Sequence, residues 1–394
     1  MTERIYYTDP YCRAFDAVVT RACVHEGRPA AILDRTAFYP TSGGQPFDTG
    51  RLGDAQVVET VDADGDVVHI LSAPLGDGAG VRGDIDWTRR FDHMQQHTGQ
   101  HMLSAAFDRL FDNRTMSFHM GADAATIDLA REAQPADVER AIDEANRVVW
   151  EDHPVSVRFA SPAEAAALAL RKEPVREGTL RLIDIQDFDL SACGGTHVAR
   201  TGAVGAIAAL AAERFRGGTR LTFVCGGRVV RHLRTYRDAI AGSIRTLSVL
   251  PAELPAAVER IQSDARDQRK TIKALQEQLA THEAARLVAA AAESAGVRVV
   301  VEVLDGWDAG GLKAIAAAAV ARARACVVLV SKDALVVARA PGVSLDANAV
   351  LRQLTERFGG KGGGKPDLAQ GGGLTGAPEE IASAARAIIP LSCG

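Results

Sequence analysis

Two short stretches decide how this chain is built: residues 97–101 read HTGQH and residues 193–197 read CGGTH. The first stretch has a histidine at each end, and the second begins with a cysteine and ends with a histidine. Neutral imidazole and thiolate suit zinc, and four such ligands complete a tetrahedral shell. The sequence therefore predicts a fold that brings both stretches around one zinc ion. The candidate ligands are His97, His101, Cys193 and His197.

The first stretch offers more histidines than one pair needs. His93 lies four positions before His97, just as His97 lies four positions before His101. Residues four apart on an α-helix are offset by only about 40°, so spacing leaves both pairs open. For CGGTH the alternative to a ligand pair is a tight loop with a buried thiol. No glutamate directly follows His93 or His97, so the general base of a His-Glu-x-x-His metalloprotease is missing.

Length and composition indicate an ordinary multidomain globular protein. The chain has 394 residues, which favours two to four domains over a single core. Its six cysteines show no CxxC spacing, so we expect no disulfide framework. The first residues lack the apolar stretch of a signal peptide, and no long uncharged apolar run predicts a transmembrane helix. We therefore expect a cytoplasmic protein that does not contact membranes.

The charge is mildly acidic overall but unevenly distributed. A net charge of −5 argues against a general polyanion binder. Residues 214–237 nevertheless contain seven arginines and no acidic residue, the densest basic stretch of the chain. The alternative to a nucleic-acid contact is a solvated face balanced by acidic helices elsewhere.

Hydrophobic periodicity predicts an α+β protein in four parts. Short runs separated by Gly and Asp clusters over residues 1–88 indicate a small antiparallel β-barrel. Residues 89–226 alternate helices and strands, as in an α+β domain. Its expected elements are a helix that Asp92 caps and that begins at His93, helices over 135–150 and 161–171, and strands over 155–159 and 179–186.

The remaining chain predicts a helical pair and a small α/β domain. Residues 227–294 carry helical stripes over 227–247 and 256–293, the second close to heptad spacing. An antiparallel hairpin that serves as a spacer or dimer contact, and a plain packed pair, both fit this pattern. Residues 295–394 alternate strands and helices around a glycine-rich loop over 359–373. Because glycines and lysines can surround an anion, Lys361 and Lys365 are candidate binding residues, although a flexible linker has the same composition.

Several motifs together resemble one known family. The run TAFYPTSGGQPFDTG at residues 36–50 closely resembles the opening of the editing region of alanyl-tRNA synthetase. HTGQH and CGGTH match the two zinc motifs of that region, and the loop 359–373 resembles the signature of the synthetase's C-terminal domain. The resemblance implies that the zinc ligands are the four candidates above and leaves His93 outside the set. It further implies that Gln45 borders the editing pocket and that Thr36 contacts the hydroxyl group of a serine substrate.

The resemblance implies a function as well. We expect a free-standing alanyl-tRNA editing protein of the long AlaX type, since the chain leaves no room for an aminoacylation core. Such proteins hydrolyse the ester of mischarged tRNA(Ala), chiefly seryl-tRNA and in some cases glycyl-tRNA. The C-terminal domain would select the tRNA or mediate dimerisation. The residues expected to contact the tRNA are Arg214, Arg216, Arg220, Lys361 and Lys365.

The chemistry expected of such a pocket is modest. An aminoacyl ester is already activated, so the site has to position water, a task expected of Gln45, and stabilise an oxyanion. A hydroxyl such as that of Thr36 can favour serine over alanine because alanine leaves it unpaired. The sequence leaves open whether zinc is structural or contacts the substrate. Two alternatives are a non-catalytic zinc-dependent tRNA-binding protein and a general zinc hydrolase of small esters.

Overall fold

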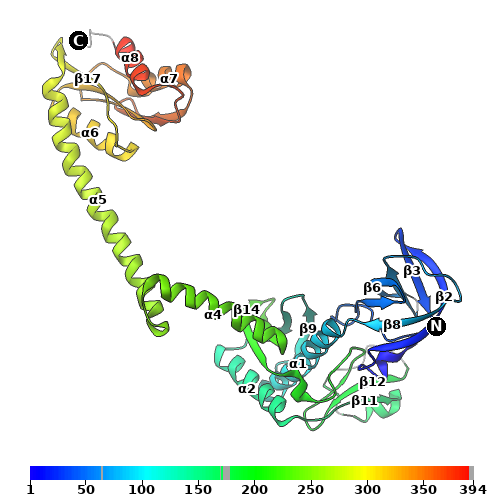
Figure 1. The fold of residues 1–394 in the computed structure, drawn as a ribbon. Coiled ribbons are helices and arrows are strands. Elements are labelled where there is room, and N and C mark those ends of the chain that lie inside the picture. The colour runs from blue at the N-terminus through cyan, green and yellow to red at the C-terminus, as the bar shows by residue number, and fades with distance from the viewer. Residues whose placement is uncertain (64, 169, 172–177, 390–394) are drawn as a thin grey trace. The chain divides into compact units, whose positions relative to one another are not determined.

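The computed structural model describes residues 1–394 apart from 64, 169, 172–177 and 390–394 (Figure 1). The chain separates into two compact units, residues 1–242 and 243–394. Helices and several sheets are mixed throughout, so the predicted α+β class is confirmed. Among the described residues, no helix is both long enough and apolar enough to cross a membrane.

The first unit opens with six strands that close into a barrel. In β2 the buried residues Phe15, Ala17 and Val19 alternate with exposed ones, as expected of a strand with one face on a core. A separate small sheet pairs β1 (Glu3–Arg4) in parallel with β4 (Arg35–Thr36). In order around the barrel, the strands are β2 (Ala14–His25), β3 (Arg28–Leu33), β7 (Asp66–Leu71), β6 (Ala55–Ala63), β5 (Gly50–Leu52) and β8 (Gly80–Ile85).

The long helix α1 (Trp87–Phe111) carries the HTGQH stretch. Its N-cap is Asp86, whose carboxylate accepts a hydrogen bond from the backbone N–H of Arg89 at 3.1 Å. The predicted start at His93 with Asp92 as cap is therefore wrong, because Asp92 lies within the helix and pairs with Arg228. Every residue from 96 to 107 is buried, as expected of a helix surrounded by other elements.

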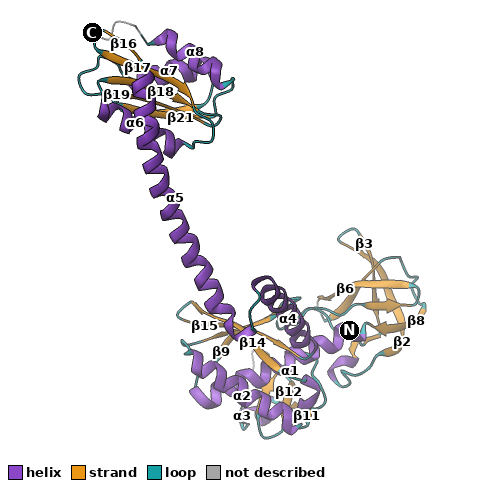
Figure 2. Cartoon of the chain, turned by 60° about the vertical axis from the view of Figure 1, so that its left-hand side comes forward, coloured by secondary structure: helices purple, strands orange, loops and turns teal. Residues whose placement is uncertain are grey.

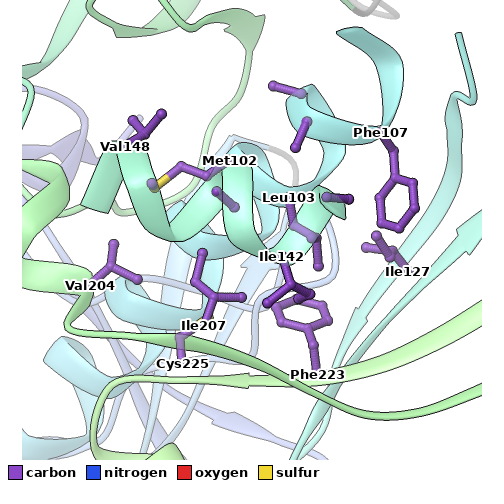
Figure 3. Close-up of a cluster of buried hydrophobic side chains, with 14 of the residues drawn as sticks. Met102, Leu103, Phe107, Ile127, Ile142, Val148, Val204, Ile207, Phe223 and Cys225 are labelled. Atoms are coloured by element: carbon purple, nitrogen blue, oxygen red, sulfur yellow. The ribbon is translucent and has the colours of Figure 1, made fainter. Parts of the chain in front are cut away.

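Two sheets and one helix enclose α1. The bounds of the helix α2 (Pro135–Glu151) match the predicted ones to within one residue. Helices α1 and α2 contribute to one hydrophobic core, in which Met102, Phe107 and Phe223 are fully buried (Figure 3). One sheet has four strands, in the order β14 (Ile207–Phe215), β15 (Gly218–Cys225), β10 (Ala125–Leu129) and β9 (Thr115–Met120). The other sheet has three strands, β11 (Val155–Ala160), β12 (Leu180–Ile185) and β13 (Asp189–Ala192).

The helix predicted over 161–171 is shorter in the structure. α3 (Pro162–Ala166) begins in a capping box formed by Ser161 and Glu164 and ends after five residues. Leu168 and Leu170 pack on the small core beneath β12 and do not continue the helix. Residue 169 of the predicted helix lies outside the described residues.

The helices predicted over 227–247 and 256–293 are present as α4 (Gly227–Leu247) and α5 (Leu254–Ala290), separated by a short 3₁₀ turn (Pro251–Glu253). Five large apolar side chains of α5 between residues 258 and 279 are exposed. These are Val258, Ile261, Ile272, Leu275 and Leu279, with exposed fractions of 42–58%. The pairing of the two helices as a hairpin stays a prediction.

The second unit has a six-stranded sheet between two helical layers (Figure 2). The last turns of α5 and the helix α6 (Ala309–Arg322) share one buried cluster with the sheet. Helices α7 (Ala347–Phe358) and α8 (Pro378–Ile388) share the other. The strand order is β16 (Ala292–Ser294), β17 (Val297–Val303), β18 (Ala325–Val330), β19 (Ala334–Arg339), β21 (Leu368–Gly372) and β20 (Lys361–Gly364).

The glycine-rich stretch expected to be a loop is a β-hairpin. β20 and β21 pair in antiparallel register, and β21 continues the sheet next to β19. A side chain at Gly362 would place its Cβ atom 2.6 Å from the carbonyl oxygen of Gln370 and 3.0 Å from Cδ2 of Leu351. Glycine therefore lets the strand approach its neighbours, a role that composition does not distinguish from flexibility.

Candidate metal centre

Four potential ligand atoms converge where α1 meets the loop that follows β13. Sγ of Cys193 lies 3.4 Å from Nε2 of His97 and 3.4 Å from Nε2 of His197. In a tetrahedron with Zn–N bonds of about 2.0–2.1 Å and Zn–S bonds of about 2.3 Å, nitrogen and sulfur lie about 3.5 Å apart. The donor set thus fits a zinc ion. The residues of this metal cluster, whose ligand atoms all lie within 4.8 Å of one another, are His97, His101, Cys193 and His197.

Each histidine of the metal cluster uses Nδ1 for a hydrogen bond that points away from the cluster. A donated Nδ1–H fixes the tautomer that leaves the Nε2 lone pair for a metal. The amide oxygen of Gln45 and the carboxylate of Asp189 can only accept, so the rings of His97 and His101 are held in the form that coordination requires. The partners are Oε1 of Gln45 for His97 at 2.8 Å, Oδ2 of Asp189 for His101 at 3.0 Å, and Oγ1 of Thr98 for His197 at 3.2 Å.

Asp189 connects the metal cluster to an arginine. Its buried carboxylate accepts hydrogen bonds from Nε of Arg171 at 2.6 Å and from Oγ of Ser191, in addition to His101. Burial alone would raise the pKa of Asp189, but the hydrogen bond from His101 and the charge of Arg171 hold it well below its usual range. Asp189 therefore stays ionised and raises the electron density on the ring of His101.

Charge also favours the thiolate form of Cys193. Burial would raise the pKa of this thiol, but the neighbouring rings of His97 and His197 outweigh burial and hold the pKa well below its usual value. The backbone N–H of Gly195 donates to the sulfur at 3.4 Å. A thiolate is the form that binds zinc.

Arg181 holds the CGGTH loop in place. Its Nη1 donates to the carbonyl oxygens of Cys193 at 2.7 Å and Gly195 at 2.9 Å, and its Nε donates to the carbonyl oxygen of Tyr7. The guanidinium group lies 5.6 Å from the centre of the Tyr7 ring, and only 8% of the residue is exposed. Its Nη2 is buried without a hydrogen-bond partner among the described residues. One buried cation thus fixes the loop that carries two of the ligands.

The metal cluster forms part of the wall of a cavity of about 590 Å³. The described lining residues include His97, His101 and Cys193 together with five aromatic side chains and three arginines. No aspartate or glutamate is among these described lining residues. The cavity therefore suits an aromatic, negatively charged ligand. Its aromatic and arginine residues are Tyr6, Tyr7, Tyr39, Phe118, Phe159, Arg4, Arg171 and Arg181.

The structure places Gln45 and Thr36 behind this wall, and neither is among the described residues that line the cavity. Oε1 of Gln45 accepts from His97 and from the backbone N–H of Thr196, while its Nε2 donates to Oγ1 of Thr196. These hydrogen bonds show that Gln45 positions His97. The expected role of Gln45 in orienting water stays a prediction. Thr36 is fully buried, and its hydroxyl lies 2.8 Å from Nε2 of His69.

The ring of His69 determines the direction of the hydrogen bond to Thr36. Nδ1 of His69 lies 3.1 Å from the carbonyl oxygen of Ala31 and must donate to it. Nε2 is then an acceptor, so the hydroxyl of Thr36 donates to it, and the same oxygen accepts from the backbone N–H of Phe38. Thr36 therefore fixes the start of the segment that leads to Tyr39 and Pro40 in the cavity wall.

The ambiguity over His93 is resolved by the geometry. His93 is buried outside the metal cluster, and its Nδ1 has no hydrogen-bond partner among the described residues. Burial, aided by the charge of Arg89, lowers the pKa of His93 to about 3, so the ring is neutral. His97 and His101 are the pair that meets Cys193 and His197.

The candidate tRNA contacts lie in both units. Arg214 and Arg220 belong to β14 and β15, where Arg214 pairs with Glu132 at 3.1 Å and Arg220 with Asp128 at 2.7 Å. Arg216 occupies the turn between these strands, with its guanidinium 5.0 Å from the ring of Phe215. In the second unit, Lys361 begins β20 and Lys365 lies in the hairpin turn, both exposed.

Sequence reasoning missed three residues of the site: Asp189, Arg181 and Arg171. For Asp189 a signal was present, because residues 189, 191 and 193 alternate along β13 into the CGGTH loop and share one face. For the two arginines no comparable pattern exists, since their roles depend on carbonyl groups and a carboxylate that are distant in sequence.

Two parts of this chain match known protein domains, and most of the chain is similar to known proteins. Residues 180–220 match the Threonyl and Alanyl tRNA synthetase second additional domain, and residues 296–390 match the DHHA1 domain. The alanine–tRNA ligase of Pyrococcus abyssi is 34% identical over 94% of this chain, and that of Halobacterium salinarum is 38% identical over 94%. The chain spans only 42% of the length of each of these ligases.

A relative of matching length is the alanyl-tRNA editing protein AlaX-L of Pyrococcus horikoshii. It is 32% identical over 97% of this chain, and the match covers 96% of the relative. Identity at this level over nearly the whole of both proteins establishes common family membership. The chain therefore belongs to the family of alanyl-tRNA editing proteins of the AlaX-L type.

Proposed function

We propose that this protein deacylates mischarged tRNA(Ala), chiefly seryl-tRNA(Ala) and as a second substrate glycyl-tRNA(Ala), in a zinc-containing pocket. The observation that carries the proposal is the metal cluster in the wall of a cavity with three arginines and no described carboxylate. Such a cavity accommodates the end of a nucleic acid next to a metal. We further propose that the protein acts in the cytoplasm, where aminoacyl-tRNAs are used.

Zinc would be held by His97, His101, Cys193 and His197, and it would supply Lewis-acid chemistry beside the ester if one of these ligands gave way to the substrate. The protein's own groups orient the reactants. Gln45 and Asp189 hold the rings of His97 and His101 through Nδ1, and Arg181 fixes the CGGTH loop. Gln100 lines the cavity and uses Nε2 on Oγ of Ser104 at 2.8 Å, so its amide oxygen remains to accept from the substrate's amino group.

We propose that Thr36 influences the preference between aminoacyl esters by positioning part of the cavity wall. Its hydroxyl proton is committed to His69, so it supports the segment that leads to Tyr39 and Pro40 in the cavity wall. Thr36→Val should reduce the preference for seryl over alanyl ester more than it lowers the overall rate. Equal loss on both esters in a deacylation assay would contradict this role.

The tRNA contacts and the assembly are proposals as well. Arg214, Arg216 and Arg220, with Lys361 and Lys365 of the second unit, supply positive charge for the phosphates. The exposed apolar residues of α5 follow heptad spacing and are suited to a homodimer contact. Light scattering of the purified protein measures the oligomeric state. We retain the division into residues 1–88, 89–226, 227–294 and 295–394 as a proposal.

Deacylation of purified seryl-, glycyl- and alanyl-tRNA(Ala) tests the function. We expect rapid release of serine, slower release of glycine and little release of alanine. Cys193→Ala or His101→Ala should abolish hydrolysis and lower the bound zinc, whereas Cys23→Ala, a half-buried thiol of the barrel, should do neither. Binding of tRNA without hydrolysis would favour the non-catalytic alternative. Hydrolysis of small serine esters at the rate of seryl-tRNA would favour a general esterase.

A further inference from the structure

Two large apolar side chains of the cavity wall are open to solvent. Phe159 of β11 is 52% exposed and Met116 of β9 is 69% exposed, and both line the same cavity as Cys193. Isolated apolar residues on a surface need no explanation, but two that line a site are unusual. Nothing in the arrangement of the metal cluster requires either side chain.

Phe159 lies in line with the metal cluster. It is directly opposite Arg181 in the pairing of β11 with β12, and the backbone N–H of Cys193 donates to the carbonyl oxygen of Arg181 at 3.1 Å. Residues opposed across neighbouring strands project from the same face of a sheet. At about 4.8 Å per strand, Phe159 is about 10 Å from the ligand Cys193, with Arg181 between them.

The charge of the cavity wall limits what can lie against Phe159. Arg4 of the wall is paired with Asp62, and Arg171 with Asp189, whereas Arg181 donates only to carbonyl oxygens among the described residues. Arg181 thus brings a positive charge that no carboxylate among the described residues pairs with next to an exposed aromatic ring. A nucleotide, with an aromatic base and a negative phosphate, is complementary to this pair.

We propose that Phe159 is the stacking surface for the terminal nucleobase of the aminoacyl-tRNA, with Met116 as a second apolar contact. The proposal rests on the proposed function, because it assumes that the ester lies at the metal cluster. The ester is carried by the terminal ribose, so the base of that nucleotide lies further out along the same row of residues. Unpaired RNA bases commonly stack on aromatic side chains.

The test compares Phe159 variants with full-length seryl-tRNA as substrate. Phe159→Ala should lower kcat/KM by about tenfold, mainly through a higher KM, because loss of one base–aromatic stack weakens binding by about that factor. Phe159→Tyr retains a ring and should restore the wild-type value. The zinc content and Tm of both variants should be unchanged. Trp150→Ala is the matched control, since Trp150 is 73% exposed and does not line the cavity.

A binding measurement separates this inference from the proposed function. The probe is 3′-seryl-amido-3′-deoxyadenosine, a non-hydrolysable analogue of the aminoacylated end. Phe159→Ala should weaken its binding about tenfold, as expected for one lost base stack. An unchanged Kd, or an equal loss in Phe159→Tyr, would overturn the stacking role even if the enzyme hydrolyses seryl-tRNA. A wild-type protein that binds the probe through Phe159 but leaves seryl-tRNA intact would refute the proposed function alone.

Discussion

The chain has two glycine-rich stretches, the CGGTH loop and the β20–β21 hairpin, and their glycines serve different ends. In the CGGTH loop, a Cβ atom at Gly195 would lie 2.1 Å from Cε1 of His97, so glycine makes room for a metal ligand. In the β20–β21 hairpin, a Cβ atom at Gly362 would lie 2.6 Å from a backbone oxygen of β21, so glycine makes room for a neighbouring strand. At both positions another group lies too close for a side chain. At Gly195 this group is a metal ligand, and at Gly362 it is the backbone of the neighbouring strand.

The surroundings of the two stretches differ just as clearly. In the CGGTH loop Gly195, Thr196 and His197 are buried, and Arg181 donates hydrogen bonds to the carbonyl oxygens of Cys193 and Gly195. In the hairpin, residues 359–367 are all exposed, with Lys361 and Lys365 in solvent. A buried, satisfied polar network fixes one geometry, whereas an exposed charged hairpin supplies a surface whose contribution depends on salt.

The largest effect is expected at Gly195. Gly195→Ala should displace the ring of His97, lower the bound zinc and abolish hydrolysis, because the added methyl group would overlap Cε1 and Nδ1 of that ring. Zinc analysis by mass spectrometry and seryl-tRNA deacylation measure the two losses. Gly194→Ala is the control, since its Cβ would meet nothing closer than 3.8 Å. Equal zinc content in the two variants would contradict this view of the loop.

The metal cluster was largely predictable from the sequence because its signal is local. Ligand types at fixed spacing identified His97, His101, Cys193 and His197, although the choice of His101 over His93 needed the family resemblance. The roles of Gln45 and Arg181 were not predictable, since they depend on partners such as Thr196 and Tyr7 that are distant in sequence. The positions of side chains relative to the cavity depend on long-range packing that no local pattern records.

The fold was predictable where periodicity was strong. Helices α2 and α4 lie within one residue of their expected bounds, because each has a continuous apolar stripe. The start of α1 is not predictable because two aspartates, Asp86 and Asp92, can each cap a helix. In the structure Asp86 is the cap and Asp92 pairs with Arg228. The glycine-rich composition of the β20–β21 hairpin predicts a loop because glycine is depleted in strands in general.

A smaller loss of zinc binding is expected at Asp189, which contacts the ligand His101 and is not itself a ligand. Asp189→Asn removes the charge behind His101 and should weaken zinc binding about 10- to 100-fold, as for other residues that orient a metal ligand. Competition with a chromophoric chelator measures the zinc affinity. Asp187→Asn provides the control, because Asp187 is exposed and its positive φ of 60° is tolerated by asparagine. An unchanged zinc affinity in Asp189→Asn would show that Asp189 does not support the metal cluster.

A methyl group added to the β20–β21 hairpin should lower the stability of the second unit and leave the rate of hydrolysis unchanged. Gly362→Ala should destabilise the second unit by about 1–3 kcal/mol, the usual cost of overpacking, because Leu351 and the backbone of β21 must move. Gly363→Ala should be close to neutral, since its Cβ would meet nothing within 4 Å. Calorimetry of the full chain with and without a chelator identifies the transition of the second unit as the one that zinc removal does not shift. Equal transitions for the two variants would contradict the packing role.

The smallest effect is expected from the lysines of the same hairpin. Replacing both Lys361 and Lys365 by Ala should raise KM for seryl-tRNA by a few-fold without changing kcat, because each phosphate contact contributes to binding and none to the reaction. The slope of log KM against log salt should fall in magnitude by about 2, one for each lysine. Lys270→Ala with Lys273→Ala, on the exposed part of α5, is the matched control for loss of two charges. Equal slopes in the two double variants would mean that the hairpin lysines act only through net charge. The glycine-rich hairpin would then contribute strand packing and no tRNA contact of its own.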